Sequence, residues 1–155
     1  NLDAWDGYPA EKDEIIAFIQ EQEVDNIVFL TGDTHSRWAF EVPTSIADYK
    51  ADSTSIVAVE FGTTSVTSAN YGHYTTLDTV EMAQNNLMNP QYNPQLKFTN
   101  LHDHGYLLLT LTPERAQADW YYVETIEKPS SEEFIGKTFT VEKGTDELVR
   151  GKVEM

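Results

Sequence analysis

An acid and an imidazole stand two positions apart, directly after a short apolar run. Residues 26–30 read NIVFL and residues 31–36 read TGDTHS. The apolar run predicts a strand buried on both faces, and Gly32 would let the chain turn sharply where this strand ends. Ligands of α/β sheets usually bind at such strand ends, and carboxylates and imidazoles hold metal ions that activate water. The spacing therefore predicts Asp33 and His35 as metal ligands.

The same two residues also fit a purely structural role. In that alternative, Asp33 caps the following turn and His35 packs under Trp38. As metal ligands, the two side chains must converge on one point, which requires the loop to leave the alternation of an extended strand. The residues alone leave both roles open.

The composition favours cations over nucleic acids as partners. The 155 residues include 26 Asp plus Glu, 10 Lys plus Arg and no cysteine, giving a formal net charge of −16 at pH 7. This length suits one domain whose core needs no disulfides, and the metal ligands that remain are oxygen and imidazole groups. The negative field repels a phosphate backbone and attracts cations, although surface solvation alone also explains such a charge.

No targeting sequence and no membrane-spanning run is visible, because the apolar stretches are far shorter than about 18 residues. The chain begins with Asn1 inside an aromatic and acidic segment. We therefore expect a piece of a longer protein that has lost its targeting sequence.

The pattern of elements predicts an α/β fold, more closely an α+β sandwich. A helix is expected to begin at Pro9, to bury Ile15, Ile16 and Ile19 and to lead into the first strand. A helix followed by a strand is half of an αβ crossover, and this order favours a parallel or mixed sheet. Around PER at residues 113–115, two β-rich runs predict a hairpin. The expected helices are residues 9–22 and 77–87, and the expected strands are residues 26–30, 38–42, 55–61 (central), 105–112, 116–125 and 138–141.

Further residues are candidates for the same chemistry. Asp3 and Asp6 add carboxylates, provided that the segment before the helix returns to the same sheet edge. Arg37 can bind a phosphate oxygen through two hydrogen bonds, although a surface arginine paired with one of the many acids is the simpler interpretation. His73 lies in a loop that can line the pocket or face solvent. His102 and His104, on either side of Asp103, resemble a metal clip but are expected on the surface.

Four segments in this order resemble the C-terminal part of the alkaline phosphatase D (PhoD-like) family. They are DAWDGYP at residues 3–9, GDTHS at 32–36, EF at 60–61 with TSVTS at 64–68, and GYLLL at 105–109 followed by Trp120. The resemblance runs from about residue 3 to residue 123. Each motif is weak alone, but their order is fairly specific.

The resemblance implies a calcineurin-like metallophosphoesterase, with a sandwich of mixed sheets, flanking helices and a multinuclear metal centre. Such enzymes hydrolyse phosphomonoesters and phosphodiesters through metal-activated hydroxide, with iron and calcium implied and other divalent metals possible. Asp33 and His35 match the family's last metal-binding motif, and Asp3, then Asp6, is the further candidate ligand. Export by the twin-arginine route implies a periplasmic or extracellular location.

The family's other ligands, including a cysteine, belong to an upstream half that this chain does not contain. We therefore expect residues 1–126 to be the C-terminal part of the catalytic domain, residues 127–155 to be an extension with a short strand, and the isolated chain to be an inactive fragment. The missing half and a phosphate-ester substrate are the expected partners. The alternative function is a non-catalytic, acidic, β-rich binding or assembly module.

Overall fold

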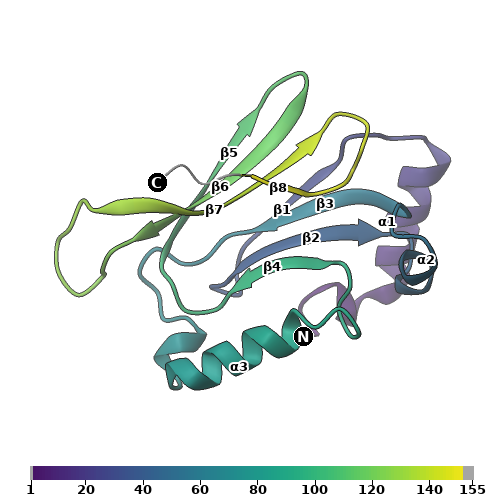
Figure 1. Ribbon diagram of the computed structural model, residues 1–155. Helices are drawn as coiled ribbons and strands as arrows, with labels where there is room; N and C mark the ends of the chain where they lie inside the picture. Colours follow the sequence, from purple (N-terminus) through teal and green to yellow (C-terminus); the bar gives the residue numbers. More distant parts are fainter. Residues whose placement is uncertain (1, 152–155) are drawn as a thin grey trace.

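The computed structural model describes residues 2–151 and contains two four-stranded sheets with helices around the first (Figure 1). The strand orders are β1-β3-β2-β4 and β5-β6-β7-β8. The elements are η1 (Trp5–Gly7), α1 (Pro9–Glu21), β1 (Val28–Thr31), β2 (Arg37–Pro43), α2 (Ile46–Ala51), β3 (Ile56–Gly62), η2 (Tyr71–His73), α3 (Leu77–Leu87), β4 (Leu96–Asn100), β5 (Gly105–Leu111), β6 (Arg115–Val123), β7 (Glu133–Glu142) and β8 (Val149–Arg150). This is the predicted α+β sandwich.

The first sheet is mixed, as predicted. Strand β1 pairs in parallel with β3, and β2 runs antiparallel to both β3 and β4. The prediction that β1 is buried on both faces is wrong, because β1 lies at the edge of the sheet and leaves Leu30 59% exposed. An apolar run marks a strand as β-forming, but it does not tell whether other elements cover both of its faces.

The helices begin where the sequence predicts. Pro9 opens α1, and Ile16 and Ile19 are buried against Val57 and Ala58 of β3. Helix α3 spans the predicted residues and is capped by the Thr76 hydroxyl, which accepts from the Thr79 N–H. Figure 1 shows α3 beside β4, on the side away from the β5–β6 hairpin. Each helix within residues 2–151 is too short or too polar to span a lipid bilayer.

The second sheet is antiparallel, and its β5–β6 hairpin confirms the prediction. Strand β7 pairs with β6 and is longer than the predicted residues 138–141. The prediction missed the first half of the strand because this half reads EFIGK and lacks a continuous apolar run. Phe139 and Val141 of β7 join the core that is shared with the first sheet. The boundary at residue 126 stays a prediction, although β7 packs together with the strands before it.

The core between the sheets is centred on Trp120, which is fully buried. Its ring meets Phe61, Phe98 and Phe139 edge-on, with centroids 5.4–6.2 Å apart, a favoured arrangement of aromatic rings. The indole N–H donates to the carbonyl of Gly62, 2.9 Å away. This bond ties β6 to the carboxyl end of β3, next to the loop that carries Asp33 and His35.

Candidate functional site

The loop that leaves β1 turns through two residues in the left-handed region. Asp33 has a φ of 67° and His35 a φ of 52°, so the loop breaks the strand's alternation. Residues of these two types adopt this conformation more readily than most, but it still costs free energy. The prediction that Gly32 makes the turn is wrong, because Gly32 is not among the residues with positive φ.

Gly32 should therefore tolerate a side chain. A Cβ built on Gly32 meets no atom within 4 Å, so we expect Gly32→Ala to change the free energy of unfolding by no more than about 0.5 kcal/mol, as is usual for surface substitutions. Urea unfolding measures this change. The contrast is Gly105→Ala, because Gly105 has a φ of 150° and its Cβ would lie 1.9 Å from the Tyr121 carbonyl oxygen. Equal losses in the two variants would contradict the assignment of the turn.

The imidazole of His35 is held in one orientation by a backbone carbonyl. Its Nδ1 lies 2.7 Å from the carbonyl oxygen of Ala69. A carbonyl only accepts, so the proton must be on Nδ1, and the neutral ring then presents a free lone pair on Nε2. Among the described residues Nε2 has no hydrogen-bond partner. Metal-binding histidines are usually oriented in this way.

The Asp33 carboxylate is exposed, and it forms no hydrogen bond or ion pair with the rest of residues 2–151. The capping role that was the structural alternative is therefore not found. Trp38, the other residue of that alternative, donates from its indole Nε1 to the Thr34 hydroxyl, 2.8 Å away. Asp33 and the Nε2 of His35 thus remain available to an external partner.

The acids near the start of the chain do not complete a metal centre. Asp3 precedes η1 and Asp6 lies within it, ahead of α1. No group of three or more His, Asp or Glu side chains in residues 2–151 is placed to hold a metal ion. The expected convergence of Asp3 and Asp6 with Asp33 and His35 is therefore absent, and the role of each as a ligand stays a prediction.

Arg37 is buried, with 0% of its surface exposed, and the expectation of a surface arginine paired with an acid is wrong. Its Nη1 donates to the Asp103 carbonyl at 2.5 Å and its Nη2 to the His104 carbonyl at 2.7 Å. The guanidinium carbon lies 3.8 Å from the ring centroid of Tyr122, and burial raises the pKa of Tyr122 to about 12. These contacts favour a structural role for Arg37, and its contact with substrate stays a prediction.

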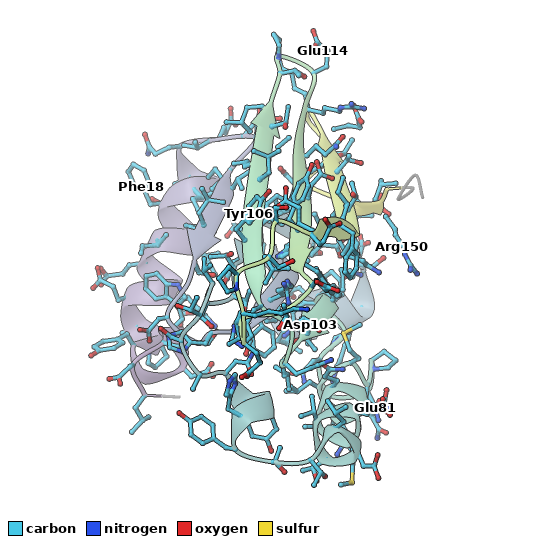
Figure 2. All side chains as sticks on the ribbon, turned by 90° about the vertical axis from the view of Figure 1, so that its left-hand side faces the viewer. Phe18, Glu81, Asp103, Tyr106, Glu114 and Arg150 are labelled. Carbon is cyan, nitrogen blue, oxygen red and sulfur yellow. The ribbon has the colours of Figure 1, made fainter. Side chains whose placement is uncertain are left out.

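The loop at residues 101–104, between β4 and β5, is hydrogen-bonded to Arg37, Thr64 and Asn70. Figure 2 places Asp103 between the hairpin that ends at Glu114 and the helix that carries Glu81. The surface position expected for His104 is wrong, because only 9% of it is exposed, and burial lowers its pKa. Its ring meets His73 edge-on at 5.2 Å between centroids. His73 is exposed, but it ends the short helix η2 and does not lie in the predicted loop.

Two connecting residues were missed by sequence reasoning. The Thr64 hydroxyl lies 2.9 Å from the His35 carbonyl and 3.2 Å from the Asp103 carbonyl. Asn70 is 2% exposed, and its amide donates to the His102 carbonyl at 2.7 Å. Both contacts join residues at least 29 positions apart in the sequence, so no local periodicity marks them.

Burial also perturbs an acid near the site. Glu60 on β3 has a pKa raised by burial, an effect that the hydrogen bond from the Thr31 hydroxyl at 2.7 Å partly offsets. Thr31 is the last residue of β1, two positions before Asp33. Any negative charge on Glu60 adds to the field that attracts a cation to this strand end.

Known proteins are similar to this chain in both sequence and fold. A sequence model of the PhoD-like phosphatase family matches residues 1–120. Alkaline phosphatase D of Bacillus subtilis (strain 168) is 33% identical over 131 residues, which are 84% of this chain and 21% of that protein. A solved structure of PhoD superposes with a TM-score of 0.78 at 29% identity, over 99% of this chain and 27% of the solved one.

The chain thus spans about a fifth to a quarter of the length of these relatives. The family match covers well over half of the chain and includes the loop with Asp33 and His35. The chain belongs to the PhoD-like phosphatase family.

Proposed function

We propose that this chain is part of a metal-dependent phosphatase or phosphodiesterase, in which Asp33 and His35 hold one cation of the catalytic centre. The orientation of His35 carries the proposal, because its Nδ1 proton is committed to the Ala69 carbonyl and Nε2 is left free. An exposed carboxylate and a neutral imidazole suit iron, and the carboxylate also suits calcium or another divalent metal. A bound cation supplies the charge that stabilises phosphoryl transfer.

Two ligands are too few for such a centre, so the proposal includes a partner. We propose that the remaining ligands come from the part of the catalytic domain that the matches leave uncovered, and that the isolated chain is inactive on phosphate esters. Stabilising an in-line displacement needs charge on both the attacking and the leaving oxygen. For the complete enzyme we propose a periplasmic or extracellular location, in keeping with its family.

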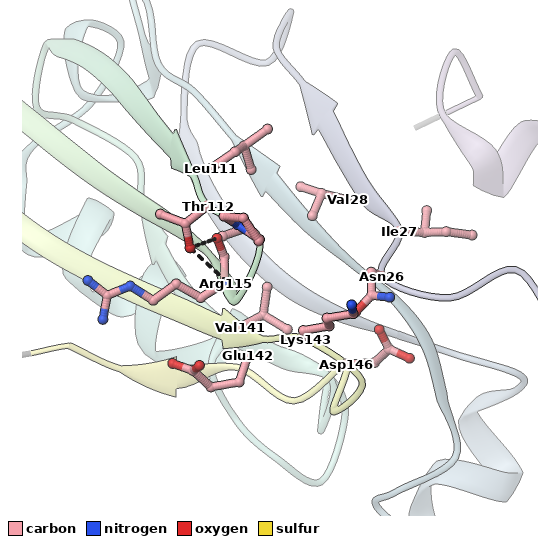
Figure 3. Close-up of a pocket in the computed structure, with 12 residues that line it drawn as sticks. Asn26, Ile27, Val28, Leu111, Thr112, Arg115, Val141, Glu142, Lys143 and Asp146 are labelled. Atoms are coloured by element: carbon pink, nitrogen blue, oxygen red, sulfur yellow. Dashed lines mark hydrogen bonds between the residues drawn. The ribbon is translucent and has the colours of Figure 1, made fainter.

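The open edge of the sandwich supports this partner. Strand β1 is one edge of the first sheet, β5 is one edge of the second, and Leu30, Leu108 and Leu111 are exposed on these two strands. Between the amino end of β1 and the β5–β6 turn opens a cavity of about 270 Å³, where Val28 and Leu111 face each other (Figure 3). A strand added beside β1 in parallel would bring its own carboxyl end next to Asp33.

Metal-linked stabilisation tests the proposal. At a metal concentration of about a hundred times Kd, we expect Fe²⁺ (without oxygen) or Ca²⁺ to raise the free energy of unfolding by about 2 to 3 kcal/mol. Asp33→Asn and His35→Ala should abolish this gain. Asp13→Asn, at an exposed position on α1, removes the same charge elsewhere and should retain it. The absence of any metal-linked gain in the wild-type chain would contradict the proposal and favour the acidic binding module.

A second measurement addresses activity. With a chromogenic phosphomonoester and the corresponding diester, the chain should show no turnover, with or without iron and calcium. Turnover that depends on His35 would show that the chain needs no partner.

A further inference from the structure

The orientation of His35 depends on the position of one carbonyl group, that of Ala69. This carbonyl accepts the Nδ1 proton of His35 at 2.7 Å. Ala69 belongs to neither a strand nor a helix, so no ladder of hydrogen bonds fixes its peptide group. Something else must hold this carbonyl toward His35.

The next residue, Asn70, is built into the protein interior. Only 2% of it is exposed, and its Nδ2 donates to the His102 carbonyl at 2.7 Å. Its Oδ1 lies 3.2 Å from the Nδ1 of His73, and its backbone carbonyl accepts from the His73 N–H at 3.0 Å. The side chain therefore links the turn at η2 to the loop at residues 101–104.

That loop is also the anchor of the segment that carries His35. Arg37 donates to the carbonyls of Asp103 and His104, and the Thr64 hydroxyl lies within hydrogen-bonding distance of both the His35 and the Asp103 carbonyls. The backbone beside His35 and the segment that contains the Ala69 carbonyl are thus both hydrogen-bonded to the loop at residues 101–104. Asn70 is the side chain that makes this connection from the Ala69 side.

We propose that Asn70 is a positioning residue: it fixes the Ala69 carbonyl, and thereby holds His35 with its proton on Nδ1 and Nε2 free for a cation. The role of the cation rests on the proposed function, whereas the effect on the proton of His35 does not. A buried amide suits this task because its NH₂ donates to the His102 carbonyl, while its oxygen remains able to accept on the side of η2. A carboxylate at this position cannot donate, and a serine hydroxyl, which can donate and accept, is too short to reach both partners.

The test is the tautomer of His35 in the metal-free chain, read from the ¹⁵N chemical shifts of the imidazole. The wild-type ring should carry its proton on Nδ1. Asn70→Ser should shift His35 toward a mixture of the two tautomers and weaken Fe²⁺ binding about 10- to 100-fold, which is typical when an outer-shell partner of a ligand is lost. Asn93→Ser is the matched control, because Asn93 Nδ2 donates to the Leu87 carbonyl at 3.0 Å in another loop.

Asn70→Asp provides a second variant of the same shape if Asn70→Ser does not fold. Its oxygen would face the His102 carbonyl in place of the NH₂ group, so the tautomer should shift here too. An unchanged Nδ1-protonated His35 in a folded Asn70 variant, or an equal shift in Asn93→Ser, would overturn the inference. Absence of Fe²⁺ binding by the wild type would contradict the proposed function instead, and the tautomer would still decide the role of Asn70.

Discussion

Replacing Arg37 by methionine should lower the free energy of unfolding by about 3 to 5 kcal/mol, because several buried acceptors lose their donor at a cost of about 1 to 3 kcal/mol each. The guanidinium is fully buried and donates to the carbonyls of Asp103, His104 and Tyr121 and to the Asn100 side chain. Methionine fills much of the volume but donates nothing. These buried acceptors would then be left without their donor.

Urea unfolding monitored by tryptophan fluorescence measures the effect, which should appear as a lower midpoint with an unchanged slope. Arg37→Lys should recover little of the loss, because one ammonium cannot reproduce the planar fork of a guanidinium. Arg115→Met is the matched control, since Arg115 is exposed. A loss below about 1 kcal/mol in Arg37→Met would contradict a network of this kind.

The contrast between Arg37 and the β5–β6 hairpin shows which features a sequence reveals. The hairpin rests on β-rich runs and a nearby turn, and α1 rests on Pro9 and the spacing of Ile16 and Ile19. These patterns are local, so the physical cause lies within the segment itself. The helix followed by a strand already favoured a parallel or mixed sheet, and the family resemblance then implied the sandwich of mixed sheets.

The burial of Arg37 and Asn70 could not be predicted from the residues next to them in the sequence. Arg37 shares the inner face of β2 with Ala39 and Glu41, and alternation alone leaves open which face is inner. The Arg37 partners lie at least 63 positions further along the chain, and the His102 carbonyl that accepts from the Asn70 amide lies 32 positions away. The convergence of Asp3 and Asp6 with Asp33 failed for a related reason, because it required a long-range path that no residue pattern specifies.

Replacing Glu41 by leucine should lower the free energy of unfolding by about 3 kcal/mol, near the lower end for a buried ion pair. Glu41 is 2% exposed and lies 2.9 Å from the Lys97 ammonium. It also accepts hydrogen bonds from the Tyr49 hydroxyl and from the Leu148 N–H. We expect the lower end because the side chain of Lys97 is 31% exposed, so water can solvate the ammonium once its partner is gone.

A double-mutant cycle separates the ion pair from simple packing. Lys97→Met alone leaves the Glu41 carboxylate buried with only Tyr49 and Leu148 as donors, whereas the double variant leaves no unpaired charge. The double variant should therefore lose about 1 to 3 kcal/mol less than the sum of the two single losses, as expected for residues in contact. Strictly additive losses at pH 7 would show that the pair contributes nothing, and that the Leu148 N–H and Tyr49 account for the effect of Glu41.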